Sequence, residues 1–131
     1  MKQVNVVALL LYKNGKILVE KRKLERRNDP GKTMIPGGHV EKDESLQKAC
    51  QRELKEELGL ECQSFNFIIK LLHHATAEDQ MTYYFSCEKW RGKPKNHEAE
   101  KIFWIGLKQL YLLDFKKDRK AVKEFFKKLT T

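Results

Sequence analysis

The feature that most constrains this chain is a helix that carries acidic residues on its apolar side. At about 100° per residue, one stripe of apolar side chains is formed by Leu46, Ala49, Cys50, Leu54 and Leu58. Lys48 and Lys55 fall on the opposite side, which is therefore the one that faces solvent. Glu57 falls inside the apolar stripe and Glu53 at its edge, with Glu56 beside them. The sequence thus predicts an amphipathic helix with three carboxylates on its buried or partly buried side.

Three carboxylates grouped in this way predict a bound cation. Without one, the like charges repel one another and lose hydration. Oxygen ligands at i, i+3 and i+4 of a helix suit a hard divalent ion such as Mg²⁺, which also keeps waters and substrate phosphates. The alternative is a solvated acidic helix end. The lysines argue against that alternative, because they already occupy the solvated face.

The spacing of these residues also carries a family resemblance. In the 23-residue segment from Gly38 to Leu60, the constrained positions are Gly38, Glu44, Arg52, Glu53, Leu54, Glu56, Glu57, Leu58, Gly59 and Leu60. This pattern resembles the Nudix box at every fixed position and is much more specific than a lone glycine motif. Pro36-Gly37-Gly38 allows close backbone approach, Ser45 can cap the helix, and Gly59 suits its end.

The Nudix resemblance implies hydrolysis of a nucleoside diphosphate linked to another group, with Mg²⁺ or Mn²⁺ bridging the phosphates. It assigns Glu56 and Glu57 as metal ligands and Glu53 as a ligand or as the base that takes a proton from water. Gly37 offers a backbone carbonyl to the metal. Arg52 orients the glutamates, for which a bidentate guanidinium is suited, although an ordinary surface ion pair is the alternative.

Outside the box the chain is similar to MutT-type nucleoside triphosphate pyrophosphohydrolases. That similarity makes Glu98 a loop carboxylate near the metals, with a catalytic or ligand role, while Glu100 is an alternative counterpart. Arg22 and Lys23 stand at the end of a strand where this subgroup places a phosphate-binding cation. Exposed charge at a strand end is the alternative for both. Gly38 is also expected to contact substrate.

The residues expected to contact the nucleotide base depart from the MutT pattern. Asp118-Arg119 stands where that subgroup has an asparagine that hydrogen-bonds an oxidised guanine. A buried polar reader supports strong discrimination between bases, so we expect a broad preference or one that is not for 8-oxo-dGTP. Phe115 and Tyr83 are candidates to stack on a base, or else belong to the core.

The remaining chain predicts an α+β fold. Strands are expected at 4–12 and 17–22, joined by a tight turn at Asn14-Gly15, and at 65–74, 81–88 and 102–105. Helices are expected at 45–58 and 119–129, whereas 24–33 and 90–96 predict loops. Mixed strands and helices imply a Nudix-type α/β/α sandwich, a mixed β-sheet flanked by helices. Residues 1–131 are expected to form a single domain.

Composition limits the partners. The net charge of +9, from 27 Lys+Arg against 18 Asp+Glu, favours anionic partners. The basic residues lack aromatic interleaving, so a small nucleotide is expected rather than nucleic acid. No apolar run has the length of a membrane span, and we expect a cytoplasmic monomer or homodimer.

The sequence has three cysteines, Cys50, Cys62 and Cys87. Their number is odd and they lack metal-ligand spacing, which predicts reduced thiols.

Two groups of rival functions remain. Within the superfamily, the chain lacks the proline typical of ADP-ribose hydrolases between Gly38 and Lys93, and it has Thr76, Ala77 and Glu78 where dinucleoside polyphosphate hydrolases have a tyrosine. An additional upstream motif of coenzyme A hydrolases is also missing. The rival from another class is a non-catalytic nucleotide- or RNA-binding module, suggested by the pI of about 9.5. An intact box favours catalysis.

Overall fold

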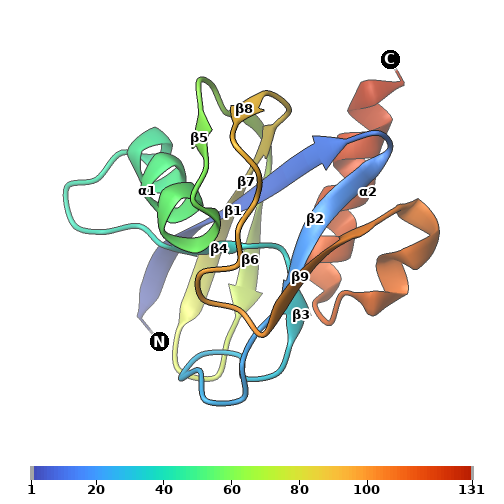
Figure 1. Cartoon of the computed structure of the whole chain (residues 1–131). Helices are drawn as coiled ribbons and strands as arrows, with labels where there is room; N and C mark the ends of the chain where they lie inside the picture. Colours follow the sequence, from blue (N-terminus) through green and yellow to red (C-terminus); the bar gives the residue numbers. More distant parts are fainter. Residues whose placement is uncertain (1, 131) are drawn as a thin grey trace.

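A computed structural model describes residues 2–130 and shows a mixed sheet between two helices (Figure 1). The main sheet contains β1 (Gln3–Lys13), β2 (Lys16–Lys21), β3 (Thr33–Met34), β4 (Gly37–His39), β6 (Asn66–His74), β7 (Asp79–Cys87) and β9 (Lys101–Ile105). A separate two-stranded ladder pairs β5 (Glu61–Cys62) with β8 (Trp90–Arg91). The helices are α1 (Leu46–Leu58), the 3₁₀-helix η1 (Leu107–Leu112) and α2 (Lys116–Leu129).

Strand β1 lies at the centre of the sheet. It runs parallel to β7, with Gln3 opposite Asp79 and Leu11 opposite Cys87. Its other edge pairs antiparallel with β4 and then, near its end, with β2. Strand order β3-β2-β1-β7-β6, with β9 beside β2, completes the sheet. Parallel and antiparallel pairs together make it a mixed sheet.

Each face of the sheet is covered by one helix, as the alternating side chains of its strands require. On one face, Leu9 and Leu11 pack in a cluster with Leu54 and Leu58 of α1. On the other face, Leu10 belongs to a cluster formed with the residues of α2, which include Ala121, Val122 and Phe125. Figure 1 shows the two helices on opposite sides of the strands. The predicted α+β sandwich is thereby confirmed.

Local sequence signals explain the turns and helix ends. Asn14 and Gly15 have φ of 51° and 77°, the left-handed conformation that a tight hairpin needs. Ser45 caps α1, because its side chain accepts a hydrogen bond from the Lys48 amide at 3.1 Å. Gly59 ends the helix at φ 65°, where residues with a β-carbon are disfavoured.

The structure adds elements that the sequence patterns did not predict. Gly37–His39, expected as loop, forms β4, and Trp90–Arg91, also expected as loop, pairs with β5. These strands have two or three residues, too few to show a period of two. Strand β7 begins at Asp79, so the turn between β6 and β7 lies before it. α2 begins at Lys116, three residues before the expected start.

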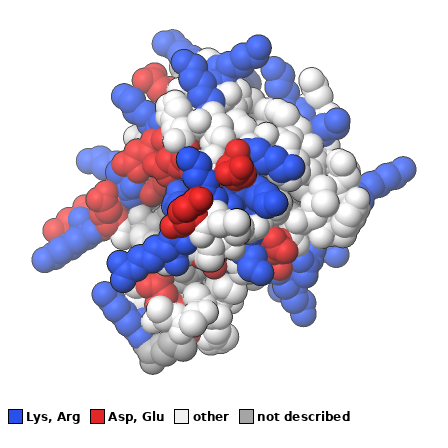
Figure 2. All heavy atoms as spheres, turned by 60° about the horizontal axis from the view of Figure 1, so that its bottom comes forward, with Lys and Arg blue, Asp and Glu red and all other residues white. Residues whose placement is uncertain are grey.

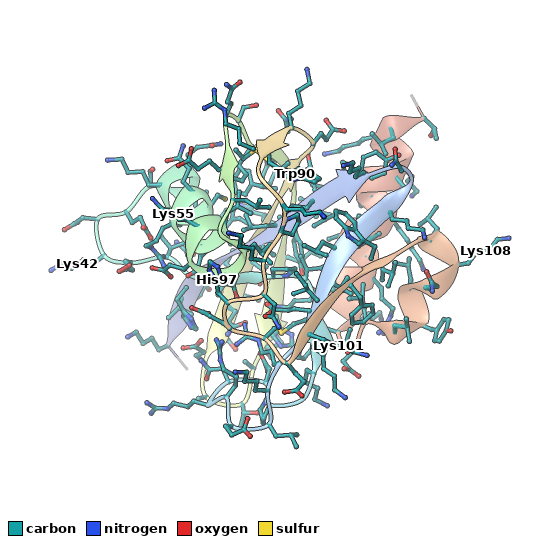
Figure 3. The ribbon with its side chains drawn as sticks, viewed as in Figure 1. Lys42, Lys55, Trp90, His97, Lys101 and Lys108 are labelled. Carbon is teal, nitrogen blue, oxygen red and sulfur yellow. A yellow bond between two sulfur atoms is a disulfide. The ribbon has the colours of Figure 1, made fainter. Side chains whose placement is uncertain are left out.

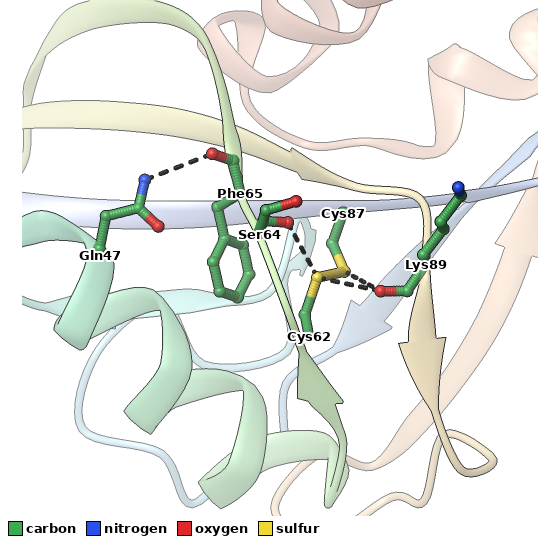
Figure 4. Close-up of a disulfide and its surroundings, with 6 residues drawn as sticks. All are labelled: Gln47, Cys62, Ser64, Phe65, Cys87 and Lys89. Carbon is green, nitrogen blue, oxygen red and sulfur yellow. Dashed lines mark hydrogen bonds between the residues drawn. A yellow bond between two sulfur atoms is a disulfide. The ribbon is translucent and has the colours of Figure 1, made fainter.

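The prediction that all cysteines are reduced thiols is wrong for two of them. Cys62 of β5 and Cys87 at the end of β7 form a disulfide (Figure 4). Cys50 is free and buried. The pattern could not reveal this pairing, because the two residues are 25 positions apart and meet only through the fold. Disulfides are typical of oxidising compartments.

Burial keeps the remaining thiol unreactive. Cys50 is fully buried in α1, and its burial, followed by the charges of Glu44 and Glu53, raises the pKa of the thiol to about 12.

Within residues 2–130, no helix is long and apolar enough to cross a membrane.

Reduction of the disulfide should lower stability. Opening the loop between Cys62 and Cys87 increases the entropy of the unfolded chain, and we expect a loss of ~3 kcal/mol in the free energy of unfolding. Urea unfolding with and without reductant measures it. Cys62→Ser/Cys87→Ser should match the reduced wild-type protein and show no further effect of reductant. Equal stability of oxidised and reduced protein would contradict the prediction.

Candidate active site

A cleft of about 350 Å³ opens between α1, β4 and the N-terminal end of α2. Its charged lining residues are Arg22, Arg26, Asp29, Glu41, Arg52, Glu53, Glu56, Glu98, Lys117 and Asp118. Figure 2, which turns the lower end of Figure 1 toward the viewer, shows acidic side chains gathered together with lysine and arginine side chains directly beside them. The cleft therefore offers both oxygen ligands and cations.

Two carboxylates of α1 are buried, as the helical pattern predicted. Glu53 is 8% exposed and Glu57 is 4% exposed. The prediction is wrong for Glu56, which was also expected on the buried or partly buried side, because its side chain is 50% exposed. Burial raises the pKa of Glu53, against the opposing effect of Arg52. Burial raises the pKa of Glu57 well above its usual value, and the charge of Glu20 adds to the effect. Among the residues that the structure describes, 2–130, Glu57 Oε2 has no hydrogen-bond partner. Such an orphaned, buried oxygen is what a bound cation would satisfy.

Arg52 holds the carboxylates of Glu44, Glu53 and Glu56 in place. Its Nε and Nη2 donate to the two oxygens of Glu44 at 2.7 and 2.9 Å. Its Nη1 donates to Glu53 at 2.8 Å and to Glu56 at 3.3 Å. A further bond from Nη2 to the carbonyl of His39 ties α1 to β4. The predicted orienting role of Arg52 is consistent with this geometry, and Glu44 is its bidentate partner at the helix start.

The two glycines of β4 bring the backbone close to these groups. A β-carbon on Gly37 would lie 2.0 Å from the carbonyl oxygen of Val7 in β1. A β-carbon on Gly38 would lie 2.3 Å from Glu53 Oε1. Backbone atoms leave no room for a β-carbon at Gly37, and a β-carbon at Gly38 would displace the Glu53 carboxylate, so the strand pairs with β1 while its backbone borders that carboxylate.

Glu20 is a buried acidic residue near Glu57 that the sequence reasoning missed. It lies on β2, is 2% exposed, and interacts electrostatically with Glu57, although it is not among the residues that line the cleft. Burial raises the pKa of Glu20, and Arg22 opposes that effect. Within residues 2–130, Glu20 Oε1 has no hydrogen-bond partner. The available signal was a glutamate that follows the apolar residues Ile17–Val19 in a predicted strand.

The loop that carries Glu98 packs against the C-terminal end of α1. The His97 amide donates to the Glu57 carbonyl at 3.2 Å, and the His97 ring lies 3.2 Å from the Glu56 carbonyl. Figure 3 shows His97 beside α1. Glu98 lines the cleft and pairs with Arg26 at 3.4 Å, whereas Glu100 lies outside the cleft. This placement favours Glu98 over Glu100.

Asp118 lies at the other end of the cleft and is 2% exposed. It accepts hydrogen bonds from the Tyr84 hydroxyl and, at 3.2 Å, from the Ile35 amide. Burial raises the pKa of Asp118, opposed by its bond with Tyr84. Lys117 Nζ donates to Thr82 Oγ1 at 3.0 Å and lines the same end. Lys117 and Thr82 were also missed, because their meeting depends on how α2 packs on the sheet.

The predicted substrate-binding residues divide into two groups. Arg22, Gly38 and Asp118 line the cleft. The structure does not bring the others into its lining. Lys23 is exposed, Tyr83 packs on the core beneath α1, Phe115 lies edge-on to His73, and Arg119 donates to the Leu113 carbonyl at 2.6 Å.

The family comparison agrees with this geometry. The sequence profile described as "NUDIX domain" matches residues 1–129. The chain belongs to the NUDIX family. The resemblance found in the box is therefore confirmed, and β4, α1 and the Glu98 loop are among the parts of this NUDIX domain that border the cleft.

Curated relatives share most of their length with the chain. It is 28% identical to the "8-oxo-dGTP diphosphatase" of Escherichia coli over 88% of this chain and 89% of the relative. It is 30% identical to the "CTP pyrophosphohydrolase" of the same organism, over 79% of this chain and 76% of the relative. The MutT-type similarity is confirmed at this level. A MutT protein structure from Methanosarcina mazei has a TM-score of 0.87, 22% identity and coverage of 99% and 97% of the two chains, which shows the shared fold.

The donors of this NUDIX domain fit a divalent cation in chemistry. Carboxylates and a backbone carbonyl are hard oxygen ligands, and two buried oxygens lack any partner. Within residues 2–130, no group of three or more aspartate, glutamate, histidine or cysteine side chains is arranged so that it could hold a metal ion. Arg52 instead holds Glu53 and Glu56.

The Glu44–Arg52 pair should make stability depend on pH in the acid range. Hydrogen bonding by Arg52 lowers the pKa of Glu44 to about 2. A depressed pKa stabilises the folded state above the unfolded value near 4.5 and loses that effect as the pH falls toward 2. Glu44→Gln should therefore lower the free energy of unfolding by about 1 kcal/mol at pH 6, and the difference from wild type should shrink below pH 4.5.

Urea unfolding at several pH values measures this difference. Glu88→Gln, an exposed position at the end of β7, is the matched control that also removes one carboxylate. A difference between wild type and Glu44→Gln that stays constant down to pH 2.5 would be incompatible with the assigned ion pair.

Proposed function

We propose that the chain hydrolyses nucleoside triphosphates, ribose or deoxyribose, to the monophosphate and pyrophosphate, with Mg²⁺ or Mn²⁺. The observation that carries the proposal is the pair of buried carboxylates on α1, Glu53 and Glu57, the first of which lines a cleft that also holds cationic side chains. Their placement is costly unless a cation compensates it. The names of the two Escherichia coli relatives support the same reaction class.

Glu53, Glu56 and Glu57, with the carbonyl of Gly37 and the carboxylate of Glu98, are the groups that would hold the cation. When bound, a divalent ion neutralises phosphate charge and lowers the pKa of a bound water. Either Glu53 or Glu98 takes the proton from the attacking water. Arg52 keeps Glu53 oriented through its bond at 2.8 Å, and therefore acts as a positioning residue.

Arg22 and Arg26 are the proposed phosphate-binding side chains. Arg22 is 7% exposed, and its guanidinium is held by the Met34 sulfur at 3.0 Å and lies 3.5 Å from the Asn28 carbonyl. Arg26 reaches Glu98 across the cleft. Lys23, the other sequence candidate, stays a proposal for a longer polyphosphate, because it is exposed beside these residues.

The base is proposed to lie toward Asp118 and Lys117. Asp118 already accepts two hydrogen bonds within the protein, so its carboxyl group is held in one orientation. A carboxyl group and an amine do not reproduce the donor and acceptor pair of a neutral amide. Roles for Tyr83, Phe115 and Arg119 in this pocket stay proposals that need a rearrangement of their present contacts.

Other functions stay possible outcomes of the tests. A Nudix hydrolase of ADP-ribose or dinucleoside polyphosphates would use the same carboxylates and differ at the far end of the substrate. A non-catalytic nucleotide- or RNA-binding module would retain nucleotide without turnover. We further propose a cytoplasmic enzyme with one domain over residues 1–131, acting as a monomer or homodimer.

Turnover should depend on a divalent cation and on the buried glutamates. Pyrophosphate release from a nucleotide panel is expected with Mg²⁺ or Mn²⁺ and should stop in excess chelator. Glu53→Gln and Glu57→Gln should each lower kcat by roughly 10²-fold or more, because charge stabilisation or base catalysis is lost. Glu61→Gln, an exposed position of β5, is the control. More than half the wild-type kcat in either variant would show that its assigned role is wrong.

Base preference should be broad or should not favour 8-oxo-dGTP. The measurement is kcat/KM for 8-oxo-dGTP against dGTP, dCTP and their ribose forms. Asp118→Asn should raise the relative kcat/KM for 8-oxo-dGTP, because it restores an amide at this end of the cleft. A wild-type preference for 8-oxo-dGTP above about 10³ would mean that other residues read the base.

A further inference from the structure

We propose that Glu20 of β2 is a further ligand of the divalent cation, so that the ion is held from the sheet as well as from α1. This inference rests on the proposed metal-dependent function and deepens it. Glu20 lies outside the box and was not among the residues that the sequence patterns identified.

The first observation is an unpartnered, buried oxygen on each of two facing residues. Glu20 is 2% exposed and Glu57 is 4% exposed, and within residues 2–130 Glu20 Oε1 and Glu57 Oε2 have no hydrogen-bond partner. The two carboxyl groups are close enough to interact electrostatically. Because they belong to β2 and α1, they approach one another from two different elements.

The second observation is the absence of a compensating cation close to Glu20. Among residues 2–130, no lysine, arginine or histidine forms an ion pair with Glu20; Arg22 and Arg26 act on it only over longer distances. A buried carboxylate without such a partner costs stability. A divalent cation between Glu20 and Glu57 would satisfy both orphaned oxygens.

The position of Glu20 in its strand excludes a simple packing role. Ile17, Leu18 and Val19, which precede it, are at most 1% exposed, so an apolar residue would be the stabilising choice at the next buried position. The backbone pairs of Glu20 with Ile102 and Met34 need no acidic side chain. A carboxylate in this place serves a ligand rather than the core.

The test measures Mn²⁺ binding to the full chain without nucleotide, by the loss of the free-Mn²⁺ signal in electron paramagnetic resonance. Glu20→Gln removes the charge but keeps the size of the side chain. We expect its Kd for Mn²⁺ to rise by about tenfold or more. Glu61→Gln, which removes a carboxylate outside the cleft, should keep the wild-type Kd.

A second variant keeps the proposal testable if the glutamine binds through its own carbonyl. Glu20→Leu offers no ligand, and it should raise Tm in metal-free protein while it weakens Mn²⁺ binding at least as much as Glu20→Gln. Wild-type protein should gain more Tm from added Mn²⁺ than either variant. The opposite changes in metal-free Tm and metal affinity distinguish a ligand from a residue that only supports the fold.

The outcomes separate this proposal from the proposed function. If Glu57→Gln loses Mn²⁺ binding while both Glu20 variants stay within twofold of wild type, Glu20 is only a partner of Glu57 and the present proposal is overturned. If wild-type protein itself binds no Mn²⁺ at millimolar concentration, the metal-dependent function falls together with it.

Discussion

The pairing of β1 with β4 is the interaction on which the site depends. It places Gly37 against the Val7 carbonyl of β1 with no room for a β-carbon, and the next residue, Gly38, then borders the Glu53 carboxylate. One face of β1 also contributes Leu9 and Leu11 to the core beneath α1. A shift of β1 by one residue would exchange its two faces, so sheet register and the position of the acidic helix are determined together.

The glutamates in and beside the cleft are not neutralised equally by cationic side chains. Arg52 neutralises the outer glutamates with four hydrogen bonds to carboxylates and one to a backbone carbonyl, and it joins α1 to β4. Glu57 and Glu20, deeper in the fold, lack an arginine or lysine at such short distance. Their raised pKa values express the cost of burying them. The proposed cation would therefore lie beside Glu57 and Glu20, whereas the carboxylates nearer the surface are oriented by Arg52.

The N-terminal part of α2 is coupled to the same strands. Asp114 accepts from the Thr33 amide at 2.7 Å, and Asp118 accepts from the Ile35 amide at 3.2 Å. The segment between these amides leads directly into Pro36 and β4. Because of these bonds, a change that moves Asp118 would also move the backbone beside Glu53. The Asp118 and Glu53 ends of the cleft therefore share one structural support.

Local patterns determined α1 and its acidic side. The apolar stripe, the Ser45 cap, the Gly59 ending and the burial of Glu53 and Glu57 follow from interactions between residues a few positions apart, which sequence periodicity records. The hairpin at Asn14-Gly15 is similarly local. Tertiary structure decided the meeting of Glu20 with Glu57, the bonds of Asp118 with Tyr84 and Ile35, and the Cys62–Cys87 disulfide. These contacts join residues far apart in the chain, and no local period specifies which strand lies beside which helix, so only the packing of the complete fold brings them together.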